Sequence, residues 1–311
     1  MQSTARADRG ATFSGSQSMK QKERFWRIAL LFLPLAVFGV FVVWPLLDTF
    51  YYSFTNWNGF SRDYRFVGLD NFAGVVTDRL FTNATVNTLI WTALAIVLPT
   101  AGGLTLALML DTQVPGAKAF KSVFYLPICL AAVVVGQIWI WIYQPDWGLL
   151  NAAITAVTGS PPAFAWLAEP ESALYSVIVA WSWQQMGLAM VIFLAGLTSI
   201  PTYLLEAAEI EGASRGQRIR HVVLALLRPA TVVAVALSVI NSLKAFDILF
   251  IMTGGGPFHS SDTLAMYMYS ESFKKYRIGY GSSISVILFL MTLSVITVYF
   301  RQLKKLDELY D

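Results

Sequence analysis

Cysteine and histidine are nearly missing from this sequence of 311 residues, which holds one cysteine and two histidines. Cys129 has no partner for an intramolecular disulfide and lies inside an apolar run, so we expect it to pack as a small apolar residue. His221 and His259 are far apart in the chain. A histidine-based metal centre or catalytic triad is therefore not expected, and we predict no metal site and no catalytic residues.

Charge is also scarce, since charged residues make up 13% of the chain whereas an average soluble domain has about 25%. The dipeptide Gly-Lys does not occur, which excludes the phosphate-binding motif G-x-x-x-x-G-K-[ST] and the nucleotide site that it forms. The formal net charge of +3 does not indicate nucleic acid, because Lys and Arg beside membrane spans account for it as topology signals. We therefore expect no bound cofactor and no nucleic-acid partner.

What the chain does have is long apolar runs, and 56% of its residues are apolar. A helix needs about 20 mostly apolar residues to cross the hydrocarbon core of a membrane. The runs that meet this length are 28–47, 86–110, 123–143, 174–197, 222–243 and 282–300. Continuous apolar runs argue against a membrane β-barrel, whose strands alternate, so each span is expected to be helical. The predicted fold is an all-α integral membrane protein with about six transmembrane helices, over residues 25–305.

The distribution of Lys and Arg orients these spans. With an inside N-terminus, the inside segments hold 14 Lys and Arg and the outside segments hold 7, with Arg228 left unassigned inside a span. This excess places both termini in the cytoplasm. Residues 1–24, rich in small and polar residues, are predicted to be a disordered cytoplasmic tail, and residues 306–311 a short cytoplasmic tail.

Three outer segments are less apolar. SFTNWNGF and FVGLDNF, between 53 and 72, are dense in aromatics, which serve either as membrane-interface anchors or as a docking surface for an external partner. The next loop, 144–173, is expected to be a surface cap. TGGGP at 253–257 predicts a turn. The following segment, SDTLAMYMYSESFKK, predicts an amphipathic helix at the membrane surface with Ser261 or Asp262 as its N-cap.

The stretch EAAEIEGASRGQRIRHVVLALLRP, from Glu206 to Pro229, crowds charges between two apolar runs. Pro201 favours a helix start, and Glu206 and Glu209 would share a face of that helix. Gly212 permits a sharp bend, and Glu211 has the spacing of an ion pair with Arg215 if the helix continues past it. The pattern predicts a helix-turn-helix on the inner face between spans four and five. A plain solvated loop with topology-setting arginines is the alternative.

This stretch resembles a family motif. EAA followed by Gly212, six residues after Glu206, is similar to the EAA loop of binding-protein-dependent ATP-binding cassette (ABC) importer permeases. Further segments similar to carbohydrate permeases of the MalF and UgpA type occur in the family order: SFTNWNGF, FVGLDNF, FLAGLTSIP, FDILFIMTGGGP and YGSSISVILF. The chain departs from the family at Leu224-Ala225, where Leu-Pro is usual, and at Glu211, where Asp is more common.

The resemblance implies that loop 200–221 contains the coupling helices that dock on an ATPase subunit. The residues expected to make or shape this contact are Glu206, Ala207, Ala208, Glu209, Gly212, Ala213 and Arg215. It also implies a homologous second permease, two ABC ATPase subunits that hold ATP and Mg, and an extracytoplasmic sugar-binding protein, all at a bacterial inner membrane. The implied cargo is a mono- or oligosaccharide, or a sugar-like solute such as glycerol 3-phosphate. The chain itself is expected not to be an enzyme.

A polar patch in span four offers the residue types that bind uncharged sugars, namely aromatic faces and side-chain amides. The candidates for the substrate path are Trp181, Trp183, Gln184 and Gln185, with Asn241, Ser242 and Lys244 on span five. Packing between helices is the alternative role for these side chains. Lys244 would favour an acidic or phosphorylated substrate.

Two other function classes compete with the importer subunit. A self-contained secondary transporter of a small polar solute is disfavoured because the first four spans contain no ionisable residue to bind a coupling ion. A membrane-embedded enzyme is disfavoured more strongly, because His, Cys and mid-span acids are scarce.

Overall fold

A computed structural model describes residues 30–111, 116–160, 162, 164–243 and 245–307. The predicted tail 1–24 and the site candidate Lys244 lie outside the described residues. In chain order the helices are Leu30–Tyr52 (containing the π-helical turn η1, Gly39–Val43, and α2, Trp44–Tyr52), α3 (Asp70–Thr77), α4 (Arg79–Leu110), α5 (Ala117–Tyr125), η2 (Leu126–Cys129), α6 (Ala132–Ile142), α7 (Leu149–Thr158), α8 (Ala173–Thr198), α9 (Thr202–Ile210), α10 (Arg215–Arg218), η3 (Ile219–Val223), α11 (Leu224–Leu226), α12 (Arg228–Leu243), α13 (Asp247–Met252), α14 (Leu264–Tyr269), η4 (Ser270–Lys274) and α15 (Ile278–Asp307).

The regular secondary structure of the described residues is helical, and one isolated antiparallel bridge joins Thr55 and Phe66 in a loop. Four helices are long and apolar enough to cross a membrane: Leu30–Tyr52, α4, α8 and Ile278–Tyr299 of α15. Two bent pairs raise the number to six if each pair is counted as one span. The all-α membrane fold expected from the apolar runs is confirmed at this level.

The two bent spans are where the structure departs from the expected straight helices. The third span breaks after Cys129, and α6 continues at 108° to the preceding helices. Leu130 and Ala131 adopt extended backbone at this break. The fifth span bends by 67° at Leu227, immediately before Arg228 and Pro229. Pro229 falls in the first turn of α12, where a missing N–H is tolerated because that group has no intrahelical acceptor.

Helices α4 and α8 form the centre of the bundle. They pack so closely that a Cβ at Gly103 would lie 2.5 Å from the Cβ of Ala189, so only glycine allows this approach. Further along the pair, the rings of Trp91 and Trp181 meet edge to face, with centroids 5.6 Å apart. The indole nitrogen of Trp91 also donates to the carbonyl of Ser242, which ties α12 to the same core.

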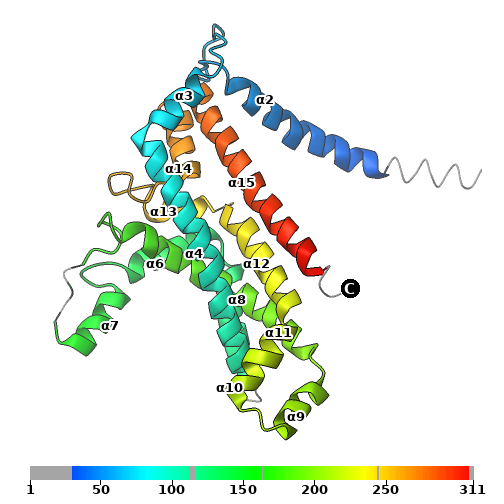
Figure 1. The fold of residues 1–311 in the computed structure, drawn as a ribbon. Helices are drawn as coiled ribbons and strands as arrows, with labels where there is room; N and C mark the ends of the chain where they lie inside the picture. The colour runs from blue at the N-terminus through cyan, green and yellow to red at the C-terminus, as the bar shows by residue number, and fades with distance from the viewer. Residues whose placement is uncertain (1–29, 112–115, 161, 163, 244, 308–311) are drawn as a thin grey trace, which may run out of the picture.

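The first span stands apart from this bundle. Figure 1 shows it leaving α3 and extending away from the other helices, and none of its most apolar stretch is buried within the chain. Near its end Phe50 contacts Phe289 of α15 edge to face. The remaining leucine, valine and phenylalanine side chains are exposed, which is the surface expected of a helix covered by lipid or by another apolar chain.

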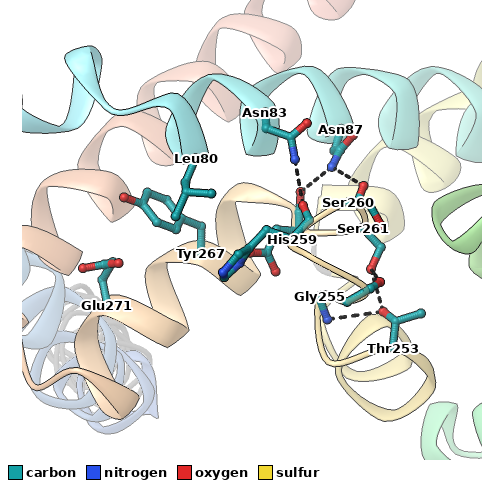
Figure 2. Close-up of polar contacts among 12 residues, drawn as sticks. Leu80, Asn83, Asn87, Thr253, Gly255, His259, Ser260, Ser261, Tyr267 and Glu271 are labelled. Atoms are coloured by element: carbon teal, nitrogen blue, oxygen red, sulfur yellow. Dashed lines mark hydrogen bonds and ion pairs between the residues drawn. The ribbon is translucent and has the colours of Figure 1, made fainter. Parts of the chain in front are cut away.

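The loop between α13 and α14 is fixed to α4 by two asparagine amides, shown in Figure 2. Asn83 donates to the carbonyl of His259, and buried Asn87 donates to the carbonyls of Ser260 and Asp262 at 2.8 and 2.9 Å. Inside the loop, the Ser261 hydroxyl donates to the Thr253 hydroxyl oxygen. This segment is therefore an ordered part of the bundle and holds α13 and α14 in place.

The helix expected at the membrane surface after this loop differs from its prediction. In α14, Leu264, Met266 and Tyr267 are buried, and the helix packs against α4 and α15. Its N-cap is Thr263, and neither Ser261 nor Asp262 caps it. The N–H of Leu264 donates instead to the hydroxyl oxygen of Thr88 on α4, so a neighbouring helix supplies the acceptor that a local cap would have given.

Candidate functional site

The charged stretch folds as two short helices, α9 and α10, separated by a tight turn. Gly212 has a φ of +83°, the left-handed conformation that favours glycine. Its N–H donates to the carbonyl of Glu209, and the N–H of Ala213 donates to the carbonyl of Ala208, both at 3.0 Å. These two bonds form a Schellman motif, which satisfies the carbonyls at the end of α9. The bend predicted at Gly212 is thus present.

The second helix starts with its own cap. The side chain of Ser214 accepts from the N–H of Gln217, and the Gln217 side chain accepts from the N–H of Ser214, which is a capping box. The ion pair predicted between Glu211 and Arg215 does not form, because α9 ends at Ile210 and the helix does not run through the bend. Glu209 pairs instead with Arg218 of α10, which closes the two helices against each other.

The exposed side of α9 mixes acidic and apolar side chains. Glu206 and Ala207 are exposed, and so are Tyr203 and Ile210, with 63% and 87% of their surface accessible. Glu209, Gly212 and Arg215 are exposed as well, whereas Ala208 and Ala213 are half-buried beneath the turn. Tyr203 and Ile210 were not predicted from the sequence. They are seven residues apart on either side of Glu206 and Ala207, which puts them on one helix face, and this spacing could have identified them.

A polar cavity of about 290 Å³ lies between α8, α12 and the breaks beside α6 and α13. Its lining consists of Ile128, Ala132, Trp181, Gln184, Gln185, Asn241, Ala245, Phe246, Asp247 and Ile248. The Asn241 amide donates to the side-chain carbonyl of Gln185 at 3.2 Å, and the Gln184 amide donates to the backbone carbonyl of Leu130 at 2.9 Å. The cavity thus has aromatic and amide groups of the kind that bind polyhydroxylated molecules.

Four of the seven predicted substrate-path residues line this cavity, namely Trp181, Gln184, Gln185 and Asn241. Trp183 and Ser242 do not. Trp183 lies on another face of α8 and packs edge to face against Trp139, and Ser242 is buried with its hydroxyl donating to the carbonyl of Val239. Successive residues of a helix point about 100° apart, because the helical period is 3.6 residues. Trp183 and Ser242 therefore face a different direction from the lining residues Gln184 and Asn241, which are next to them in sequence.

Six of the ten described lining residues were not predicted from the sequence: Ile128, Ala132, Ala245, Phe246, Asp247 and Ile248. Ile128 and Ala132 come from the break in the third span, which the sequence analysis took as a continuous helix. Asp247 comes from the start of α13, just after the end of α12. The sequence did contain a signal for Asp247. A charged side chain at the edge of a membrane span costs free energy, so such a residue is usually kept for a function. Among the described residues, no group of three His, Cys, Asp or Glu side chains is placed to hold a metal ion.

The bundle is apolar, two of its spans are broken, a partly open polar cavity lies between α8 and α12, and a charged helix-turn-helix lies at one end. These features are typical of the membrane-spanning subunit of a transporter. Residues 103–307 match the family described as "Binding-protein-dependent transport system inner membrane component". The chain belongs to this family. It is accordingly a multi-pass inner-membrane permease subunit of an ABC importer, and it is not itself the catalytic ATPase.

Individual relatives agree with this assignment. The chain is 37% identical over 273 residues to a probable ABC transporter permease protein of Pyrococcus horikoshii, covering 88% of this chain and 94% of the relative. It is 32% identical to the trehalose/maltose transport system permease protein MalF of Thermococcus litoralis, covering 88% and 92%. In structure it resembles a chain of a bacterial ABC transporter involved in importing the acidic polysaccharide alginate, with a TM-score of 0.78, 21% identity and coverage of 93% and 99%.

Proposed function

We propose that this chain forms the translocation pathway for a carbohydrate in an ATP-driven importer, and that loop 200–221 couples this pathway to a partner ATPase. The observation that carries the proposal is the hydrogen bond between Gln185 of α8 and Asn241 of α12. These are the two helices that the loop connects at their other ends, through α9 on one side and α10, η3 and α11 on the other. Force applied to the loop would therefore act on both walls of the cavity.

The exposed side of α9 is the proposed contact with the ATPase. Tyr203 and Ile210 supply apolar area, Glu206 supplies charge, and Ala207 allows close approach between them. Exposed apolar side chains grouped on one short helix are typical of a protein interface. Gly212 and the Glu209–Arg218 pair fix the angle at which α9 is presented. ATP-driven closure of the ATPase subunits would push on this surface and rock α8 and α12.

The proposed orientation places this loop and both termini in the cytoplasm. The excess of Lys and Arg on the corresponding segments, 14 against 7, supports it. Figure 1 shows α9 and α10 at one end of the bundle and α3 and α14 at the other. The end of the bundle that contains α3 and α14 would then face the external binding protein.

The proposed cargo is a sugar, and the cavity beside Trp181 is its proposed binding site. A family relative is described as a trehalose/maltose permease and a structural relative as an alginate importer, so the cargo class is shared among similar proteins. The proposed complex contains this chain, a homologous second permease, two ATPases that bind ATP and Mg, and an extracytoplasmic sugar-binding protein.

Co-purification tests the coupling role. The tagged chain is isolated from its native membrane as wild type, as Glu206→Ala and as Gly212→Pro. Wild type should bring an ATPase and a second permease, and both variants should lose ATPase while keeping the second permease. Proline fixes φ near −65°, whereas Gly212 requires +83°, so this change removes the turn. A wild-type chain that purifies alone and still moves a solute would favour a secondary transporter.

A further inference from the structure

We infer that Asp247 makes the cavity between α8 and α12 electronegative, so that it admits neutral or amine-bearing sugars and disfavours anionic ones. The inference rests on the proposed function for its choice of sugars as cargo. The charge selectivity itself concerns only the cavity and is tested without transport.

The lining of the cavity is the first observation. Among the ten described lining residues, Asp247 is the single charged one, and the polar others are the neutral amides Gln184, Gln185 and Asn241. Aspartate is negative at neutral pH. A cleft with low-dielectric walls and charge of one sign raises the local concentration of the opposite charge and lowers that of its own sign. Apolar Ile128, Ala132 and Ile248 provide such walls here.

The second observation is which hydrogen-bonding groups of the three lining amides are left without a partner. Within the described part of the chain, the Asn241–Gln185 contact occupies one donor and one acceptor, and the Gln184 contact occupies one donor. This leaves the Asn241 side-chain carbonyl, the Gln185 amide and the Gln184 side-chain carbonyl for a ligand. Sugar hydroxyls both donate and accept, so they satisfy these groups and can also donate to the Asp247 carboxylate. The carboxylate of a uronate and a doubly ionised phosphate have no proton to donate to the Asp247 carboxylate, and their negative charge is repelled by it.

The position of Asp247 makes this effect accessible to a solute. Its side chain is exposed, and it is the first residue of α13, immediately after Phe246. Phe246 also lines the cavity, so an aromatic residue directly precedes the acid in the lining. This combination suits a sugar with a neutral or protonated amine substituent, which can stack on the ring and donate to the acid.

Thiol labelling measures the charge selectivity directly. In the importer purified with its partner subunits, Cys129→Ser removes the native thiol of this chain and Ala132→Cys places one in the lining that also contains Asp247. The labelling rates of a trimethylammonium and a sulfonate methanethiosulfonate are compared, and their ratio is normalised to that of a small free thiol. We expect a normalised ratio of about 10 in favour of the cation, falling toward 1 with Asp247→Asn or with high salt.

Two variants serve as controls. Asp63→Asn changes an exposed acid of the outer loop outside the lining and should leave the ratio unchanged. Lys244→Gln tests the basic residue that precedes this segment in sequence. A ratio below 1, or a ratio that responds to Lys244→Gln and not to Asp247→Asn, would overturn the inference.

Uptake into proteoliposomes tests the choice of sugars. Neutral, amine-bearing and uronic-acid disaccharides are offered with ATP and the external binding protein. Accumulation of the neutral or amine-bearing members alone supports the inference, and accumulation of a uronic-acid member at an equal rate contradicts it. If no sugar accumulates but the thiol ratio behaves as expected, the carbohydrate proposal fails and the charge selectivity of the cavity stands.

Discussion

The carboxylate of Glu209 pairs with the guanidinium of Arg218 across the turn at Gly212, and this contact joins the two short helices of the charged loop. The residues are nine apart, so the pair depends on the turn and could not form in one continuous helix. The Schellman bonds at Gly212 and the capping box at Ser214 set the geometry that brings the two side chains together.

This ion pair should contribute modestly to coupling. The side chains are 67% and 25% exposed, and exposed pairs are worth at most about 1 kcal/mol. Glu209→Gln and Arg218→Gln should each lower transport-coupled ATP hydrolysis by less than about tenfold, because the turn still forms. The double variant Glu209→Arg with Arg218→Glu should recover most of the loss. A double variant that is worse than either single change would show that Glu209 or Arg218 contacts the partner directly.

The left-handed turn should be more sensitive than its neighbours. Gly212→Ala puts a Cβ at φ +83°, which costs about 1–2 kcal/mol, and should reduce the ATPase that co-purifies with the chain. Gly216→Ala is the matched control, because Gly216 lies in α10 and an added Cβ would meet nothing within 4 Å. It should bind ATPase as the wild type does. Equal loss in both variants would mean that the loop tolerates no added side chain for another reason.

The two asparagines that hold the loop after α13 should differ in their contribution to stability. Asn87→Leu leaves the carbonyls of Ser260 and Asp262 without their donor inside the protein, at a cost of about 1–3 kcal/mol. The melting temperature in detergent should fall by several degrees. Asn83→Leu removes one bond at an exposed position and should change the melting temperature less. The opposite order would contradict the role assigned to the buried amide.

Asp78 should make stability depend on pH. Burial acts to raise the pKa of this carboxyl, but hydrogen bonds from the Tyr267 hydroxyl, the Leu80 N–H and the Tyr280 hydroxyl outweigh it and hold the pKa below its usual 3.8. A lowered pKa in the folded state stabilises the protein above the unfolded value, and this stabilisation is lost as the pH falls through that range.

The melting temperatures of wild type and Asp78→Asn measure this contribution. Their difference should be largest near neutral pH and should shrink below about pH 4. Tyr267→Phe removes the first of the hydrogen bonds that lower this pKa, so the folded-state pKa moves toward the unfolded value and the part of the stability that depends on pH should be smaller than in wild type. A difference between wild type and Asp78→Asn that is constant with pH would show that folding does not lower the pKa of Asp78.

Much of the fold and part of the site could be predicted from residue patterns. Apolar runs of span length predict membrane helices because lipid offers no partner to backbone amides. Gly212 predicts a turn because glycine alone enters the left-handed region without strain. The same reasoning selected Trp181, Gln184, Gln185 and Asn241, since amides and indoles are costly to leave unpartnered in an apolar helix. These arguments concern single residues or a local period. They also selected Trp183 and Ser242, which do not line the cavity, and the role of all these residues in binding a substrate stays a prediction.

Contacts between distant segments could not be predicted in this way. The 108° break after Cys129 brings Ile128 and Ala132 to the cavity, and no local pattern gives its direction. Thr88 of α4 caps α14 in place of Ser261 or Asp262, and Arg218 takes Glu209 where Arg215 and Glu211 had the helical spacing. Thr88 lies 176 residues from Leu264, and Arg218 reaches Glu209 only because of the turn at Gly212, so neither contact follows from helical spacing.

The sequence by itself determined that this chain is a helical membrane protein of the importer permease family, because hydrophobicity, backbone hydrogen bonding and a motif in correct order are local properties. Only the tertiary structure decided which side chains share a cavity, because helix rotation and interhelical packing set that. In that structure Asp247 lines the same cavity as Trp181 and Asn241, whereas Trp183 and Ser242 face other parts of the bundle.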